Sequence, residues 1–192
     1  GVLGQASPMI QEMFPGVISV SAAAGFVGLL SLANMIGRIG WSSLSDRIGR
    51  KAVYATFFAL GAALYATVPA TGHAGNVVLF VLGYVIILTM YGGGFATIPA
   101  YLRDMFGVVQ VGAIHGRLLT AWSTAGILGP MLVNYIREYE IAHGVPKADA
   151  YTTTMHIMAG LLVVGFVCNV FVRPVDVRHL ELESPAVAPV SA

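Results

Sequence analysis

Two long apolar stretches joined by a short basic turn place the strongest constraint on how this chain folds. The turn is Asp46-Arg-Ile-Gly-Arg-Lys51, in which one acid and three bases are packed into six residues. On each side, roughly twenty residues carry almost no charge, and about 20 residues is the length a helix needs to cross a bilayer. We interpret the segment as a tight turn between two membrane helices. Short loops rich in Lys and Arg lie on the cytoplasmic side, so the three bases place this turn there.

The composition excludes an ordinary soluble domain. Hydrophobic residues make up 57% of the 192 residues, only 10% are charged, and the mean hydropathy is +0.80. Soluble domains usually have about 25% charged residues. A net charge of +1 with no large basic patch gives no indication of a nucleic-acid partner. The single cysteine, Cys168, lies in an apolar run, so no intrachain disulfide is possible and a packing role is expected.

The distribution of apolar runs predicts an all-α integral membrane protein embedded in a lipid bilayer. Residues 1–14 are too short to span a membrane, and we interpret them as the end of a truncated helix. Residues 17–173 hold five full spans, expected at about 17–44, 52–71, 77–102, 111–136 and 151–172. The Gly92-Gly93-Gly94 run and Pro99 are expected to interrupt the third of these spans. The mixed-charge segment 137–150 is expected to be an external loop, and residues 174–192 a disordered cytoplasmic tail.

The positions of the bases support one orientation. Six bases fall in the segments assigned to the cytoplasm, namely Arg47, Arg50, Lys51, Arg103, Arg173 and Arg178. Only Arg137 and Lys147 fall in the external segments, which agrees with the excess of positive charge expected inside. The remaining two bases, Arg38 and Arg117, lie within predicted spans.

Arg38 is the strongest candidate for chemistry. It belongs to a stripe of polar residues spaced three or four apart, which lie on one helix face: Ser31, Asn34, Arg38, Ser42 and Ser45. An arginine inside a membrane helix costs roughly 2.5–3.5 kcal/mol even on insertion scales, so its presence usually has a function. Its planar, permanently charged group suits the binding of a carboxylate, and we assign Arg38 and its neighbour on the stripe, Asn34, to a substrate site. The alternative is that Arg38 extends to the cytoplasmic interface or pairs with an acid in a helix of the missing half.

The basic turn also resembles the loop signature of the major facilitator superfamily of transporters, Gly-x-x-x-Asp-Arg-x-Gly-Arg-Arg/Lys. Here Ser42 replaces the first glycine of that pattern, and Gly40 is the nearest glycine upstream. Residues 37–51, 92–102 and 112–122 resemble the oxalate/formate antiporter branch. The resemblance implies the C-terminal six-helix half of a carrier, with part of helix 7 and helices 8–12. It further implies a missing N-terminal half, a location in a bacterial inner membrane, and a small organic anion as the partner.

The resemblance extends to individual residues of a substrate site. Arg38 matches an arginine that the anion carriers keep in helix 8, and Tyr91 and Phe95 match aromatic residues that line the cavity in helix 10. Trp122 stands where the oxalate carriers have a lysine in helix 11. Without that lysine, a doubly charged oxalate would lose one partner, so a monocarboxylate or a less charge-dense anion is favoured. Packing in the core remains the alternative for all three aromatic residues.

The basic turn is expected to act in gating rather than in substrate binding. Asp46 should bond to neighbouring bases and a helix N-terminus, and the family implies a contact with the other half that favours one of the two alternating states. The residues assigned to this motif are Asp46, Arg47, Gly49, Arg50 and Lys51. Arg117 lies near the start of its span and suits a gate or an interface anchor as well as a ligand contact. Helix packing is the expected role of His115 and His156.

The sequence therefore predicts secondary active transport of small organic anions by alternating access. No nucleophile–base set, metal-ligand spacing or phosphate-binding glycine loop is present in the spans, so we expect no enzyme, no cofactor and no metal. A membrane sensor remains an alternative. So does a carrier of a neutral or drug-like solute. Uptake of a neutral or cationic solute would predict acids inside the membrane, and the five full spans contain none.

Overall fold

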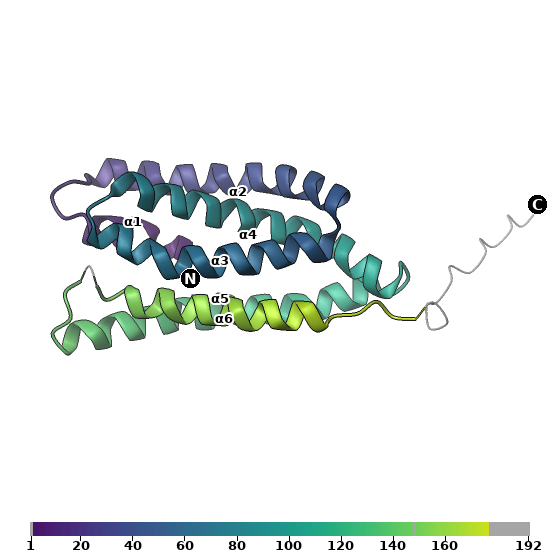
Figure 1. The fold of residues 1–192 in the computed structure, drawn as a ribbon. Coiled ribbons are helices and arrows are strands. Elements are labelled where there is room, and N and C mark those ends of the chain that lie inside the picture. The colour runs from purple at the N-terminus through teal and green to yellow at the C-terminus, as the bar shows by residue number, and fades with distance from the viewer. Residues whose placement is uncertain (1, 148, 177–192) are drawn as a thin grey trace, which may run out of the picture.

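A computed structural model describes residues 2–147 and 149–176, and all regular elements in this part of the chain are α-helices (Figure 1). In chain order they are α1 (Val2–Met13), α2 (Val20–Ile48), α3 (Arg50–His73), α4 (Val77–Phe106), α5 (Val111–Ala142) and α6 (Thr152–Phe171). The expectation of an all-helical protein is confirmed. Most of the predicted tail, residues 177–192, lies outside the described residues.

Local signals set the helix ends. The Ser19 hydroxyl accepts a hydrogen bond from the Ala22 amide at the start of α2, and the Asn76 side chain accepts one from Leu79 at the start of α4. Such side chains satisfy amides that have no partner within the helix. Gly49 alone separates α2 from α3, with φ of +88°. Glycine adopts this conformation without the strain that a side chain would cause, so the tight turn is built as expected.

Four helices are long and apolar enough to cross a membrane, namely α2, α3, α4 and α6. The longest helix, α5, has 32 residues but does not reach the same apolarity within the described chain. It continues to Ala142, so the predicted loop from residue 137 was wrong over its first six positions, 137–142. No glycine or proline interrupts the chain there before Gly144 and Pro146, and the mixed charges alone do not stop a helix.

The helices run back and forth between two ends (Figure 1). We call the end with the Gly49 turn, the α4–α5 connection and the end of α6 the basic end, and the other the opposite end. Helices α2 and α4 lie side by side, α3 packs against α4 and α6, and α1 packs against α2. Helix α5 touches α4 and α6 only lightly, and Val133 is its one buried residue.

The glycines of α4 serve close packing rather than interruption, so the expected break in this span does not occur. The helix runs unbroken through Gly92, Gly93 and Pro99. A methyl group at Gly92 would overlap the backbone carbonyl of Asn34 on α2, and one at Gly93 would overlap the side chain of Trp41. Small residues let membrane helices approach closely, which explains the tight α2–α4 pair.

The best-packed region lies toward the opposite end, between α1, α2 and α4. The fully buried rings of Phe80 and Tyr84 lie there. Phe14 makes an edge contact with Phe80 at a centroid distance of 5.3 Å, and Phe26 makes one with Tyr84 at 6.1 Å. The side of α2 and α4 that carries Arg38 and Phe95 lies outside this core. That surface remains available for a site.

Candidate functional site

Arg38 is positioned by the residue one helical turn before it. Its Nε donates a hydrogen bond to Oδ1 of Asn34 at 3.3 Å, as the spacing of four residues allows. Within residues 2–147 and 149–176, no carboxylate forms an ion pair with Arg38. Arg38 is therefore left without an acidic partner in this part of the chain, and pairing with an acid of a helix outside it stays a prediction.

Aromatic rings from two other helices extend the site from Arg38. The guanidinium carbon lies over the Phe95 ring, 5.4 Å from its centroid. Phe95 contacts Trp122 of α5 with ring centroids 4.9 Å apart, and Trp122 contacts Tyr91 at 5.5 Å. All five residues assigned to substrate binding thus form one chain of contacts across α2, α4 and α5. We call this set the Arg38 cluster (Asn34, Arg38, Tyr91, Phe95 and Trp122).

The rings of the Arg38 cluster are not part of the packed core. Phe95, Trp122 and Tyr91 are 36%, 45% and 46% exposed. They contact one another and border open space between the helices. A guanidinium beside aromatic faces is held by attraction to the π electrons and still has donors free for an anion.

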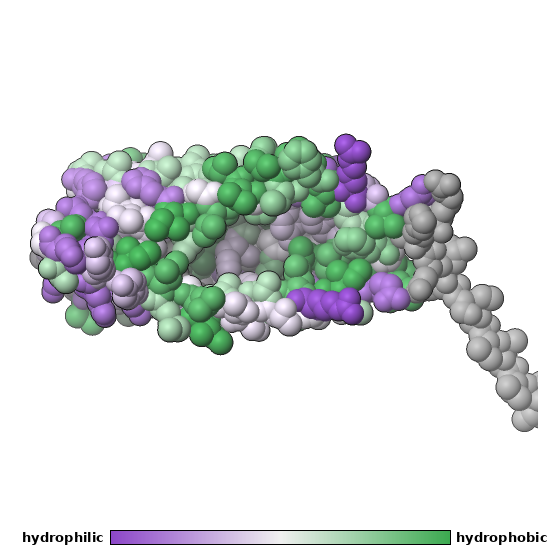
Figure 2. Space-filling model, turned by 90° about the horizontal axis from the view of Figure 1, so that it is seen from below, coloured by the Kyte–Doolittle hydropathy of each residue, from purple (hydrophilic) through white to green (hydrophobic). Residues whose placement is uncertain are grey.

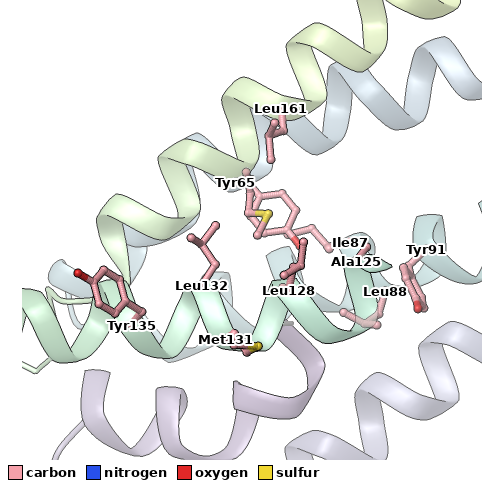
Figure 3. Close-up of a pocket in the computed structure, with 12 residues that line it drawn as sticks. Tyr65, Ile87, Leu88, Tyr91, Ala125, Leu128, Met131, Leu132, Tyr135 and Leu161 are labelled. Atoms are coloured by element: carbon pink, nitrogen blue, oxygen red, sulfur yellow. The ribbon is translucent and has the colours of Figure 1, made fainter. Parts of the chain in front are cut away.

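Two cavities lie along α5, one on each side of the Arg38 cluster. The first, of about 340 Å³, lies toward the basic end and is lined by Phe95, Trp122, His115 and Ala125 among others. The second, of about 720 Å³, lies toward the opposite end and also reaches Ala125 (Figure 3). Figure 2 views the α5–α6 side and shows a hollow in the middle of that face, bordered by hydrophobic side chains. The loose contact of α5 with its neighbours leaves room for both cavities.

The other intramembrane candidates lie apart from Arg38. Arg117 is exposed and lines neither cavity. His115 lines the smaller cavity, and its buried Nδ1 has no hydrogen-bond partner among the described residues. His156 is exposed on α6, so the expected packing role of this histidine within the protein is not supported.

The basic turn is tied to α4 and α6. Arg50 pairs with Asp46 one turn earlier, at 2.7 Å, and with Asp104 of α4, at 3.1 Å. Lys51 donates to the backbone carbonyls of Val170 and Val172 at the end of α6, at 2.9 and 2.7 Å. Such carbonyls have no partner within the helix and carry its negative dipole end. Asp46 does bond to a neighbouring base, as expected, but Arg50 and Lys51 make the contacts with other helices.

Sequence reasoning missed a polar cluster near the opposite end. Glu12 of α1 forms an ion pair with Arg137 of α5, and Arg137 also lies over the Tyr151 ring. Two turns earlier on α1, Gln5 donates to the side chain of Asn134 at 2.8 Å. The signal was present in the spacing, because Gln5 and Glu12 are seven apart and Asn134 and Arg137 three apart. Each pair therefore shares a helix face.

The described residues hold no group of three His, Cys, Asp or Glu side chains that could bind a metal ion. The geometry offers a cation without an acidic partner, an aromatic wall and two adjoining cavities. Small-ligand sites commonly combine a mostly apolar wall with a few precisely placed polar groups. This arrangement suits binding of a small anion.

Comparison with known proteins adds one match. The family model described as Major Facilitator Superfamily matches residues 4–191, nearly the whole chain. Neither a curated protein nor a solved structure matches this chain.

Proposed function

The chain belongs to the major facilitator superfamily and is a multi-pass membrane transporter, and from this premise we propose that it carries small organic anions by alternating access. The proposal rests on the surroundings of Arg38. It is a permanent cation between membrane helices, without an acidic partner among the described residues, and beside open space. Such a group is costly in a membrane unless an anion or water meets it.

The Arg38 cluster supplies the parts of a carboxylate site. Asn34 holds Nε, so the two terminal nitrogens of Arg38 are left to bind both oxygens of a carboxylate. The joined rings of Phe95, Trp122 and Tyr91 offer an apolar wall for the rest of the anion. One guanidinium matches one carboxylate, which favours monocarboxylates such as formate, lactate or pyruvate over oxalate.

We propose that the described helices act as the C-terminal half of a larger carrier. Transporters of this kind rock one six-helix half against the other around a site at the midplane. The six helices here would form one such half, with a separate N-terminal half closing the site. Without that half, we expect binding but no transport. We assign the basic end to the cytoplasm of a bacterial inner membrane, with Arg117 and the basic turn at the gate.

A second candidate is transport of a neutral, drug-like solute. It is favoured by the larger cavity, whose lining residues include no charged side chain. A non-transporting membrane sensor is the remaining alternative, and no structural observation favours it.

The test is uptake of labelled formate, oxalate, lactate and pyruvate by liposomes that contain the complete transporter. We expect at least one monocarboxylate to accumulate and Arg38→Gln to lower its uptake roughly tenfold or more. This expectation follows from hydrogen bonds to charged groups being worth about 1.5–3 kcal/mol. Arg103→Gln is the control, because it removes an exposed arginine of α4 that belongs neither to the Arg38 cluster nor to the residues assigned to the gate. Equal uptake by Arg38→Gln and the parent would assign Arg38 a structural role and direct the search to Arg117.

A further inference from the structure

The larger cavity has a chemical character that the Arg38 cluster does not share. It has a volume of about 720 Å³, within the usual range for small-molecule sites (Figure 3). Its lining consists of aliphatic, methionine and tyrosine side chains with small residues of α5, and it includes Tyr91, Leu128 and Leu132. Burying a charge among these groups would be unfavourable, whereas burying a hydrocarbon group would be favourable.

One residue joins this cavity to the cation. Tyr91 lines the cavity, and its ring contacts Trp122 of the Arg38 cluster. The apolar cavity therefore adjoins the Arg38 cluster at Tyr91, at the end of the aromatic wall that begins with Phe95 beside Arg38.

We propose that the transported anion is a monocarboxylate with a bulky apolar group, branched or aromatic, and that this group occupies the larger cavity. The inference rests on the proposed anion transport and narrows its substrate class. Formate and oxalate would leave most of the cavity unfilled. A second carboxylate pointing into the cavity would meet no cation, because no lining residue is charged.

The part of the cavity wall that α5 forms allows the proposed substrate class to be tested. Leu128 and Leu132 are four residues apart and both line the cavity. Leu128→Trp would fill part of the cavity without touching Arg38. The adjacent Ile127 is 66% exposed and does not line the cavity, so Ile127→Trp adds the same bulk on a different face.

The experiment uses the complete transporter in liposomes and compares uptake of formate, pyruvate, 4-methyl-2-oxopentanoate and benzoate. We expect the last two to be carried best, and Leu128→Trp to lower their uptake about tenfold or more while leaving pyruvate uptake nearly unchanged. Ile127→Trp should match the parent for all four acids. Thermal unfolding in detergent identifies any variant that has lost its fold, and Leu132→Phe then replaces Leu128→Trp.

The outcomes separate the two proposals. If Arg38→Gln abolishes uptake but formate and pyruvate are preferred, or Leu128→Trp leaves benzoate uptake intact, the cavity inference is wrong and anion transport stands. If acids are taken up but none depends on Arg38, the cavity inference fails and anion transport stands with another site; if no acid is taken up, both proposals fail. A phospholipid that stays bound to the purified parent and is lost in Leu128→Trp would assign the cavity to a lipid chain and overturn the inference.

Discussion

Gly92 on α4 lies against the backbone carbonyl of Asn34 on α2, so close that a methyl group at Gly92 would overlap that oxygen. Asn34 also accepts the hydrogen bond from Arg38. The packing of α2 on α4 and the orientation of the candidate anion site therefore depend on the same residue. Any change that separates these two helices should alter both stability and binding.

The first prediction concerns this contact. Gly92→Ala should destabilise the protein by about 1–3 kcal/mol, because the helices must move apart to admit the methyl group. The measurement is the unfolding midpoint in detergent. Gly126→Ala is the control, because a methyl group at this position meets nothing within 4 Å. The substitution also replaces a flexible residue of α5. A midpoint for Gly92→Ala equal to that of Gly126→Ala would contradict the close approach.

The second prediction concerns the basic turn. Lys51→Met should lower stability by about 1–2 kcal/mol, because two carbonyls at the end of α6 lose a charged donor. Hydrogen exchange of the last turn of α6 should increase at the same time. Arg47→Met removes an exposed base from the same turn and should have little effect on either measurement. Equal effects of the two variants would show that net charge, not the contact with α6, is what matters.

The third prediction concerns substrate charge. Trp122→Lys places a second cation beside Phe95 and Tyr91, close to Arg38. We expect it to raise uptake of oxalate relative to formate by roughly tenfold, the effect of about 1.4 kcal/mol from one added charge partner. Trp122→Phe keeps the aromatic wall and should leave the ratio unchanged. A ratio unaffected by the lysine would remove position 122 from the site.

The fourth prediction concerns the link between α1 and α5. Glu12→Ala and Arg137→Ala should each cost about 1–3 kcal/mol, because each leaves a charge with only about a fifth of its surface exposed and no partner. The exchange Glu12→Arg with Arg137→Glu should restore part of the loss. Glu138→Gln, next to Arg137 but exposed, serves as the control. Additive losses in the exchanged double variant would mean that the two side chains do not interact.

The features of this protein that can be predicted from the sequence are those set by the local spacing of its residues. The long apolar runs indicate the spans, and Gly49 between bases indicates the tight turn. Asn34 with Arg38, and Tyr91 with Phe95, are four apart and share helix faces. The position of Trp122 beside them came from the family resemblance, because spacing within one helix says nothing about a neighbouring helix.

The features that cannot be predicted from the sequence depend on contacts between helices. The glycines of α4 could either weaken that helix or let a neighbouring helix pack closely against it. Only the position of α2 decides between these two roles. The pairing of Glu12 with Arg137 joins residues 125 positions apart. The extension of α5 to Ala142 does not follow from the mixed charge of residues 137–142, because mixed charge is as compatible with a helix as with a loop.

The pairing of α3 with α6 bears on how the protein is assembled in the membrane. Phe58 of α3 lies where a side chain at Gly165 would be, and Lys51 at the start of α3 binds the end of α6. During synthesis, α3 leaves the ribosome long before α6, so this face lacks its α6 partner until α6 is inserted. Until then, α3 must rely on lipid or an insertion chaperone to cover it. A chain that ends before α6 would expose the same face permanently and become a substrate for membrane quality control.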